Sequence, residues 1–333
     1  MSVVVLCVLS DLELANARSL RTRRIHKEHE EVWENLEFNL SFIFDDMIKF
    51  KLSLLIPAIL FSILCHQPML RRTGIQFSNL QCRETPPLPL SAPTKTIRSR
   101  FRVLAIAEGG GHHILYSQRA RIWLNQLARD SAFTIDYIEK PDSIDEAFLS
   151  RYQLFIQLDF PPYMWSKKSM EAFQKYIEQG RGGWIGFHHA TLLGEFDGYS
   201  MWNWFSNFMG GIRFKNYIAT FVSGTVHTED KVHPCMKGVP GTFVIKKEEW
   251  YTYDKSPRPN VHVIASVDES SYLPPSAITM GDHPVVWTND AYRARNIYIF
   301  MGHSPDLFEN ASYTTLFRNA IFWAAQRPDS SKN

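Results

Sequence analysis

The sequence contains few cysteines and lacks the common motifs for nucleophilic catalysis and for nucleotide binding. Only four of its 333 residues are cysteine, and only Cys235 lies where the chain has a regular pattern of strands and helices. A disulfide framework or a cysteine-rich metal site is therefore excluded in that region. Cys235 follows His233 and Pro234 in an expected loop, and nothing nearby would stabilise its thiolate. We interpret it as a small buried residue and not as a catalytic thiol.

Motifs for nucleophilic catalysis and for nucleotide binding are also absent. No Gly-x-Ser-x-Gly or Gly-x-Cys-x-Gly turn occurs where an α/β hydrolase carries its nucleophile. The glycines at 109–111 lack the spacing of a dinucleotide-binding or Walker loop, so no nucleotide cofactor is expected. The 36 lysines and arginines are almost balanced by 34 aspartates and glutamates, and residues 101–333 carry no basic stripe. Nucleic acid is therefore not an expected partner.

The first hundred residues show no domain pattern. Residues 1–46 have no sustained period, and we interpret them as a non-native or disordered extension. Met47 begins a short basic segment that precedes a predominantly apolar stretch of 13 residues, Leu52–Leu64. This is the layout of a secretory signal peptide over 47–65, and it predicts export to the periplasm or to the outer face of a membrane. The rival interpretation is a genuine extension with an internal membrane anchor. Prolines cluster in residues 66–100, which predicts an extended linker.

From residue 101 to 326, apolar strands alternate with amphipathic helices. This pattern predicts an α/β domain of the flavodoxin type, a three-layer sandwich in which helices cover both faces of a mostly parallel sheet. The second half is richer in strands. We expect strands at 102–107, 133–138, 152–158, 184–187, 218–226, 243–253, 261–267, 285–288 and 296–300, and helices at 116–128, 166–178, from about 201, and at 313–325.

Histidine is the residue type that points most clearly to a function. Three of the twelve histidines, His113, His188 and His303, directly follow expected strands. The carboxyl ends of parallel strands lie along one edge of the sheet, where α/β proteins place ligand sites, so these side chains are expected to converge. Histidine is the commonest metal ligand and the usual acid/base residue near neutral pH. With a carboxylate, these three would suit zinc or a similar divalent ion.

Each histidine also has a structural interpretation, because a single strand-end histidine is more often a hydrogen-bonded loop residue than a ligand. Three at comparable positions favour a functional edge. His233 and His283 precede prolines, where shaping of a loop explains them equally well. The candidate carboxylates are Glu108, Asp159, Glu248 and Glu249.

A series of short motifs accompanies these histidines along the whole domain. They are the His113 loop, the Gly-x-His-x-Ala turn at 186–190, His-Pro at 233–234 with Gly-Val-Pro at 238–240, Glu-Trp-Tyr at 249–251, His-Pro-Val-Val-Trp-Thr at 283–288, Gly-His-Ser-Pro at 302–305 and Phe-Trp-Ala-Ala at 322–325. In this order they resemble the ThuA-like (trehalose-utilisation) family, which has the fold of class I glutamine amidotransferases without their cysteine triad. The paired histidines at 112–113 and 188–189 depart from the family, which often has a single histidine there.

The resemblance implies a protein of disaccharide utilisation that works through 3-keto-sugar intermediates. We expect elimination or hydrolysis of a glycoside or 3-keto-glycoside, with a divalent metal as the candidate cofactor. A small-molecule sugar is the expected partner, and a sugar oxidoreductase and a homo-oligomer are further candidates. The expected catalytic residues are His113, His188, His303 and Glu249, with the three histidines also the candidate metal ligands. The expected sugar-binding residues are Glu108, His189, Trp250, Tyr251 and His283.

Two non-catalytic alternatives stay open. The chain could be a partner subunit of a sugar oxidoreductase, which would show activity only with that partner. It could also be a carbohydrate-binding module that stacks sugar rings on tryptophans. The tryptophans considered for that role are Trp165, Trp184, Trp202, Trp204 and Trp250.

Overall fold

A nine-stranded sheet organises residues 99–326, the part of the chain that the computed structural model describes. Five of its strands are parallel neighbours in the order β2-β1-β3-β4-β11, which is the order of flavodoxin-like sheets. Every residue of β3, β4 and β11 is buried, which explains their unbroken apolar sequences. The predicted fold class is confirmed. The five strands are β1 (Arg102–Ala107), β2 (Thr134–Ile138), β3 (Leu154–Leu158), β4 (Gly183–Phe187) and β11 (Asn296–Ile299).

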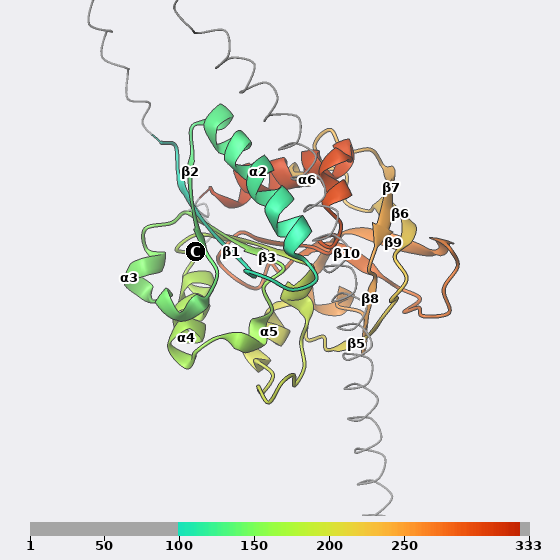
Figure 1. Cartoon of the computed structure of the whole chain (residues 1–333), viewed down its shortest axis with the longest axis horizontal. Helices are drawn as coiled ribbons and strands as arrows, with labels where there is room; N and C mark the ends of the chain where they lie inside the picture. The colour runs from blue at the N-terminus through green and yellow to red at the C-terminus, as the bar shows by residue number, and fades with distance from the viewer. Residues whose placement is uncertain (1–98, 327–333) are drawn as a thin grey trace, which may run out of the picture. The chain divides into compact units, whose positions relative to one another are not determined.

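Helices cover both faces of the parallel strands. Figure 1 shows α2 and α6 on one side of the sheet and α3, α4 and α5 on the other. α4 begins at the predicted cap, where the Oγ atom of Ser166 accepts a hydrogen bond from the backbone N–H of Ser169 at 3.2 Å. Within residues 99–326, no helix has both the length and the apolar character needed to cross a bilayer. The helices are α2 (Ile114–Ser131), α3 (Glu146–Leu149), α4 (Lys167–Glu178), α5 (Asn203–Phe208) and α6 (Ala311–Ala324).

Four antiparallel strands extend the sheet beyond β11. They pair in the order β10-β9-β6-β7. The sequence indicated strands in this region but not their direction. A separate two-stranded sheet, which was not predicted, pairs β5 with β8. The bounds are β5 (Phe214–Tyr217), β6 (Val222–Thr228), β7 (Thr242–Glu248), β8 (Tyr251–Tyr253), β9 (His262–Leu273) and β10 (Pro284–Thr288).

The single strand expected at 243–253 was wrong, because the chain forms two strands there in different sheets. β7 has a register shift opposite β6 between Ile245 and Glu248, and Lys247 adopts a positive φ of 52°. This bulge moves the alternation of side chains by one residue, so Lys246 and Lys247 are both exposed and Glu248 is buried. The chain then turns through Glu249 into β8.

The expectations for the extension at 1–46, the signal peptide at 47–65 and the linker up to residue 98 lie outside the described residues.

Candidate functional site

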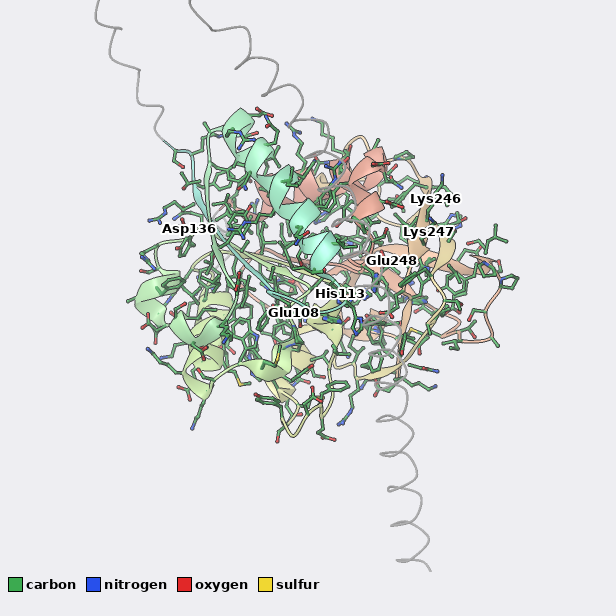
Figure 2. All side chains as sticks on the ribbon, in the orientation of Figure 1. Glu108, His113, Asp136, Lys246, Lys247 and Glu248 are labelled. Atoms are coloured by element: carbon green, nitrogen blue, oxygen red, sulfur yellow. The ribbon has the colours of Figure 1, made fainter. Side chains whose placement is uncertain are left out.

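Four histidines lie ring against ring at the carboxyl edge of the parallel strands. His113 ends the loop after β1, His188 and His189 form the short turn η3 (His188–Thr191) after β4, and His303 follows β11. The ring centroid of His113 is 5.0 Å from that of His188, 3.9 Å from that of His189 and 4.4 Å from that of His303. His113 is therefore the centre of the cluster. Figure 2 shows it with Glu108 at the amino-terminal end of α2.

Three glutamates surround the histidine rings. Glu249 places Oε2 3.3 Å from Nε2 of His188, and Glu248 places Oε1 4.0 Å from Nδ1 of the same ring. The backbone N–H groups of Glu249 and His303 donate to this Oε1 atom of Glu248, at 3.2 and 3.1 Å. Glu108 lies on the other side, with Oε1 3.8 Å from Nδ1 of His189. The cluster thus pairs imidazole rings with carboxyl groups from two separate segments, the loop after β1 and the end of β7.

Asp159 lies beneath the cluster with both carboxyl oxygens buried and without a hydrogen-bond partner. It follows β3, and its backbone carbonyl faces Nδ1 of His189 at 2.9 Å. Gly302 packs so closely that a Cβ atom there would lie 2.8 Å from both Oδ1 of Asp159 and Cβ of His188. Residue 302 must therefore be glycine if the acid and the histidine turn are to approach each other.

The backbone is strained at the two residues that meet beside Gly302. His188 has a φ of 31° and Asp159 a φ of 45°, values that residues with a side chain rarely adopt. Hydroxyl groups hold the histidine turn in place: Tyr298 and Thr191 both donate to the backbone carbonyl of His188 at 3.0 Å. The Thr191 hydroxyl also lies 2.7 Å from that of Tyr253. This network positions His188, and no motif in the sequence indicated it.

Burial favours the uncharged form of His113, His188 and His303. It lowers the pKa of His113 and His188 well below the usual value, and the neighbouring His189 lowers both further. Burial, followed by the proximity of His188, lowers the pKa of His303 to about 3. Neutral imidazole is the form that binds a metal ion or accepts a proton.

The two most buried acids are shifted in the opposite direction. Burial raises the pKa of Asp159 well above its usual value, and the nearby Glu248 carboxylate raises it further. Burial likewise raises the pKa of Glu248, although the backbone N–H of Glu249 works against this shift. Burial of this kind favours the uncharged carboxyl group, and a cation beside it would favour the carboxylate.

The donor atoms fit a divalent cation. Two overlapping sets each bring their ligand atoms within 4.8 Å of one another: His113, His188 and His189, and His113, Glu249 and His303. Both ring nitrogens of His113 are buried without a hydrogen-bond partner, a costly arrangement unless another group completes it. Imidazole nitrogens with one carboxylate are the ligands that zinc and similar ions prefer.

The expected sugar-binding residues divide into two groups. Glu108, His189 and Tyr251 belong to the cluster, and the ring of Tyr251 lies 4.3 Å from that of His188. Trp250 is fully buried, donates from Nε1 to the carbonyl of Val222 at 3.0 Å and has its ring centroid 5.3 Å from that of Phe300.

His283 is also buried, with Nδ1 2.9 Å from Oε1 of Glu269 and 3.1 Å from the hydroxyl of Tyr272. Direct sugar contact by Trp250 or His283 is therefore not supported, because both belong to the core behind the site. His233 caps the short helix η4 (Pro234–Met236), where its Nδ1 atom accepts a hydrogen bond from the backbone N–H of Cys235 at 3.3 Å. Cys235 is fully buried, and burial raises the pKa of its thiol, as expected for a structural cysteine.

Phe221 is a member of the site that sequence reasoning missed. Its ring centroid lies 4.6 Å from that of His303, and 46% of its surface is exposed. A phenylalanine within an expected strand, here 218–226, resembles any core residue, so the sequence carried no signal that could have distinguished it.

Comparison with known proteins agrees with this geometry. Residues 102–324 match the family model ThuA, described as trehalose utilisation. The crystal structure of a ThuA-like protein from Bacteroides uniformis ATCC 8492 is 28% identical, with a TM-score of 0.63 over 72% of this chain and 97% of that one. A ThuA-like protein from Parabacteroides merdae ATCC 43184 is 20% identical and shares the fold, with a TM-score of 0.50 over 68% of this chain and 90% of that one. No curated protein matches the chain. The family model spans the whole sheet and every residue of the histidine cluster, and the chain therefore belongs to the ThuA family.

Proposed function

We propose that this protein is a sugar-processing enzyme of disaccharide utilisation. It acts on a glycoside, most readily one already oxidised to a 3-keto form, by elimination or hydrolysis. The observation that carries the proposal is the cluster of His113, His188, His189 and His303, whose rings meet at the sheet edge beside three glutamates. A structural role would not require four imidazoles packed around one another, of which His113, His188 and His303 have pKa values lowered by burial.

A 3-keto substrate suits a site without a nucleophile. The ketone acidifies the neighbouring C–H bond, so a side-chain base can remove that proton and the glycosidic oxygen can leave from the adjacent carbon. His303 is the candidate base nearest the surface, because it is only partly buried and lies next to the exposed Phe221. Glu249 holds Nε2 of His188 and fixes the orientation of that ring. The buried Cys235 has no part in this chemistry.

The same residues support a divalent metal as a cofactor. His113 would be shared by either ligand set, with His188 and His189 or with Glu249 and His303. When bound, such an ion would polarise the ketone and stabilise the enolate. The protein's own residues would still bind the sugar hydroxyls, through Glu108 and Glu249, and keep water away through the buried face of the cluster.

The binding-module alternative loses its main support. Trp165, Trp184, Trp202 and Trp250 are buried, and Nε1 of Trp204 donates to Glu178 at 2.7 Å. These tryptophans pack the core and do not offer a stacking surface. A sugar oxidoreductase as partner, a homo-oligomer and export from the cell remain proposals.

The test is turnover of trehalose and of 3-keto-trehalose by the purified protein, with and without a chelator. The His188→Ala and His303→Ala variants should lose about 10²- to 10⁴-fold in rate, the usual contribution of a general acid or base. The matched control is His262→Ala, because His262 is a surface residue whose Nε2 lies 3.1 Å from Asp230.

Near-parental rates for both cluster variants, with folding confirmed by circular dichroism, would contradict the proposal. Elemental analysis of the same preparations tests the metal separately. Metal content that is equal in the parent and in His113→Ala would rule out a metal held by this cluster.

A further inference from the structure

The accessible members of the histidine cluster mark where a ligand enters. Glu108, His189 and Glu249 have side chains that are 21%, 14% and 15% exposed, whereas the side chain of His188 is fully buried. A substrate must therefore approach across these three residues and His303. All of them offer polar or charged atoms, which suit the hydroxyl groups of a sugar. A pyranose ring also has faces made of C–H groups, and these need an apolar partner.

Exposed aromatic rings are few on the described surface, and one of them lies at this entrance. Within residues 99–326, seven large apolar side chains are exposed, and Phe221 and Tyr199 are the two aromatic ones. Scattered exposed aliphatic residues are ordinary on protein surfaces. Phe221 contacts His303 of the cluster, and Tyr199 contacts Tyr163, whose turn packs against the turn that carries His188 and His189.

Phe221 forms one side of the entrance. It precedes β6, its ring centroid is 4.6 Å from that of His303, and it is 46% exposed. No other ring contact of Phe221 is found among the described residues, so the exposed part of the ring is available to a ligand.

Tyr199 belongs to a group of three rings on a different segment. Its centroid lies 5.9 Å from that of Tyr163, which in turn is 5.2 Å from that of Phe196. Tyr163 is part of the short turn η2 (Pro162–Met164), which packs against η3, the turn that carries His188 and His189. Tyr199 is 49% exposed. This aromatic group is thus tied to the histidine turn and not to β6.

We propose that Phe221 and the Tyr163–Tyr199 pair are the apolar walls against which the pyranose rings of a disaccharide stack. The proposal rests on the proposed function, because it assigns the substrate contacts of the same site. Flat aromatic side chains supply a large contact area at little cost in conformational entropy. The carboxylates of Glu108 and Glu249 would then take the sugar hydroxyls at the edge of each ring. These walls differ from the tryptophans that the sequence suggested, all of which pack elsewhere.

The experiment compares Phe221→Ala and Tyr199→Ala with Ile122→Ala, which removes an apolar side chain that is 61% exposed on the outer surface of α2. Calorimetry with trehalose and steady-state kinetics with 3-keto-trehalose are measured for each. Phe221→Ala and Tyr199→Ala should each raise Kd and KM by roughly two- to tenfold, the effect typical of one aromatic contact, while kcat stays within about twofold. Phe221→Trp, which keeps an aromatic ring at this position, should bind the sugar with the Kd of the parent. Ile122→Ala should also match the parent.

The outcomes separate the two proposals. If the parent converts its substrate and both aromatic variants bind like Ile122→Ala, the wall assignment is wrong and the proposed function stands. If the parent neither binds nor converts either sugar, the proposed function fails and the walls fail with it. Thermal melting checks that each variant is folded, and because the two rings lie on separate segments, a misfolded variant of one leaves the other to decide.

Discussion

Gly302 separates the buried acid Asp159 from the strained turn at His188, and its lack of a side chain is essential there. A Cβ atom at 302 would lie 2.8 Å from both neighbours, closer than real Cβ contacts allow. Gly302→Ala should therefore lower the free energy of unfolding by about 1–3 kcal/mol, the usual cost of overpacking a core. It should also slow turnover by displacing His188. Gly110→Ala is the control in urea unfolding, because nothing lies within 4 Å of its added Cβ, and a change of about 0.5 kcal/mol or less is expected.

The buried carboxyl of Asp159 makes stability depend on pH in a predictable direction. Its folded pKa is raised above that of the unfolded chain, so its contribution is fully present below about pH 4 and is lost as the pH rises toward the folded pKa. The Asp159→Asn variant has no carboxyl group to ionise at this position, so it does not lose this stability as the pH rises. The variant should gain stability relative to the parent by up to about 1.4 kcal/mol for each pH unit between pH 5 and pH 7.

Urea unfolding with a chelator present measures this difference without a metal charge beside the carboxyl. Asp145→Asn is the control, because Phe148 N–H, followed by Lys168, lowers the pKa of Asp145. A lowered pKa gives a contribution that is constant above the unfolded pKa, so this variant should differ from the parent by the same amount at pH 5 and pH 7. A constant difference for Asp159→Asn as well would contradict the assignment of a raised pKa.

At the scale of single elements, the bulge in β7 turns Glu248 inward, so that it reaches the cluster together with Glu249. Lys247 adopts a left-handed conformation that costs a residue with a side chain about 1–2 kcal/mol. Lys247→Gly should therefore be neutral or slightly stabilising, because relief of this strain offsets the greater flexibility of glycine. Figure 2 labels both Lys247 and the neighbouring Lys246 on β7, and both are exposed.

Lys246→Gly is the matched control, because Lys246 has no positive φ and its replacement relieves no strain. This variant should lose about 0.5–1 kcal/mol in the free energy of unfolding, the usual cost of the greater flexibility of glycine. Thermal and urea unfolding of the two variants should differ in free energy by about 1–2 kcal/mol. Equal destabilisation by both would show that the bulge is not strained in solution.

The same bulge explains how far the sequence could predict the site. His113, His188 and His303 were predictable, because each follows an apolar run and parallel strands end at one edge. The inward position of Glu248 was not, because a one-residue shift of phase leaves no trace in an alternating pattern. Trp250 and His283 were misplaced for a related reason: a motif shared across a family does not distinguish residues that touch a ligand from residues that support them.

At the scale of the whole molecule, the fold class and nine segments that form strands could be predicted from hydrophobic periodicity. The start of α4 could be predicted from its capping residue, Ser166. The antiparallel half could not, since strand direction depends on long-range pairing that local sequence does not encode. The exposed rings of Phe221 and Tyr199 were equally hidden, because exposure is a property of the packed molecule and not of residue type.

The position of β11 in the sheet has a consequence for how the chain is made. β11 lies between β4 and β10, yet of the strands within residues 99–326 it is the last to leave the ribosome. A chain that stops after Asp290 should leave the edges of β4 and β10 unpaired and should aggregate, whereas full-length His303→Ala should stay soluble in the same centrifugation assay. A soluble, monomeric truncated chain would contradict this. Domains generally fold as units during synthesis, amino-terminal first. Here the nascent chain has neither a joined sheet nor a complete histidine cluster until residue 303 has emerged, so the folded sheet and the capacity to bind a ligand arise together at that point.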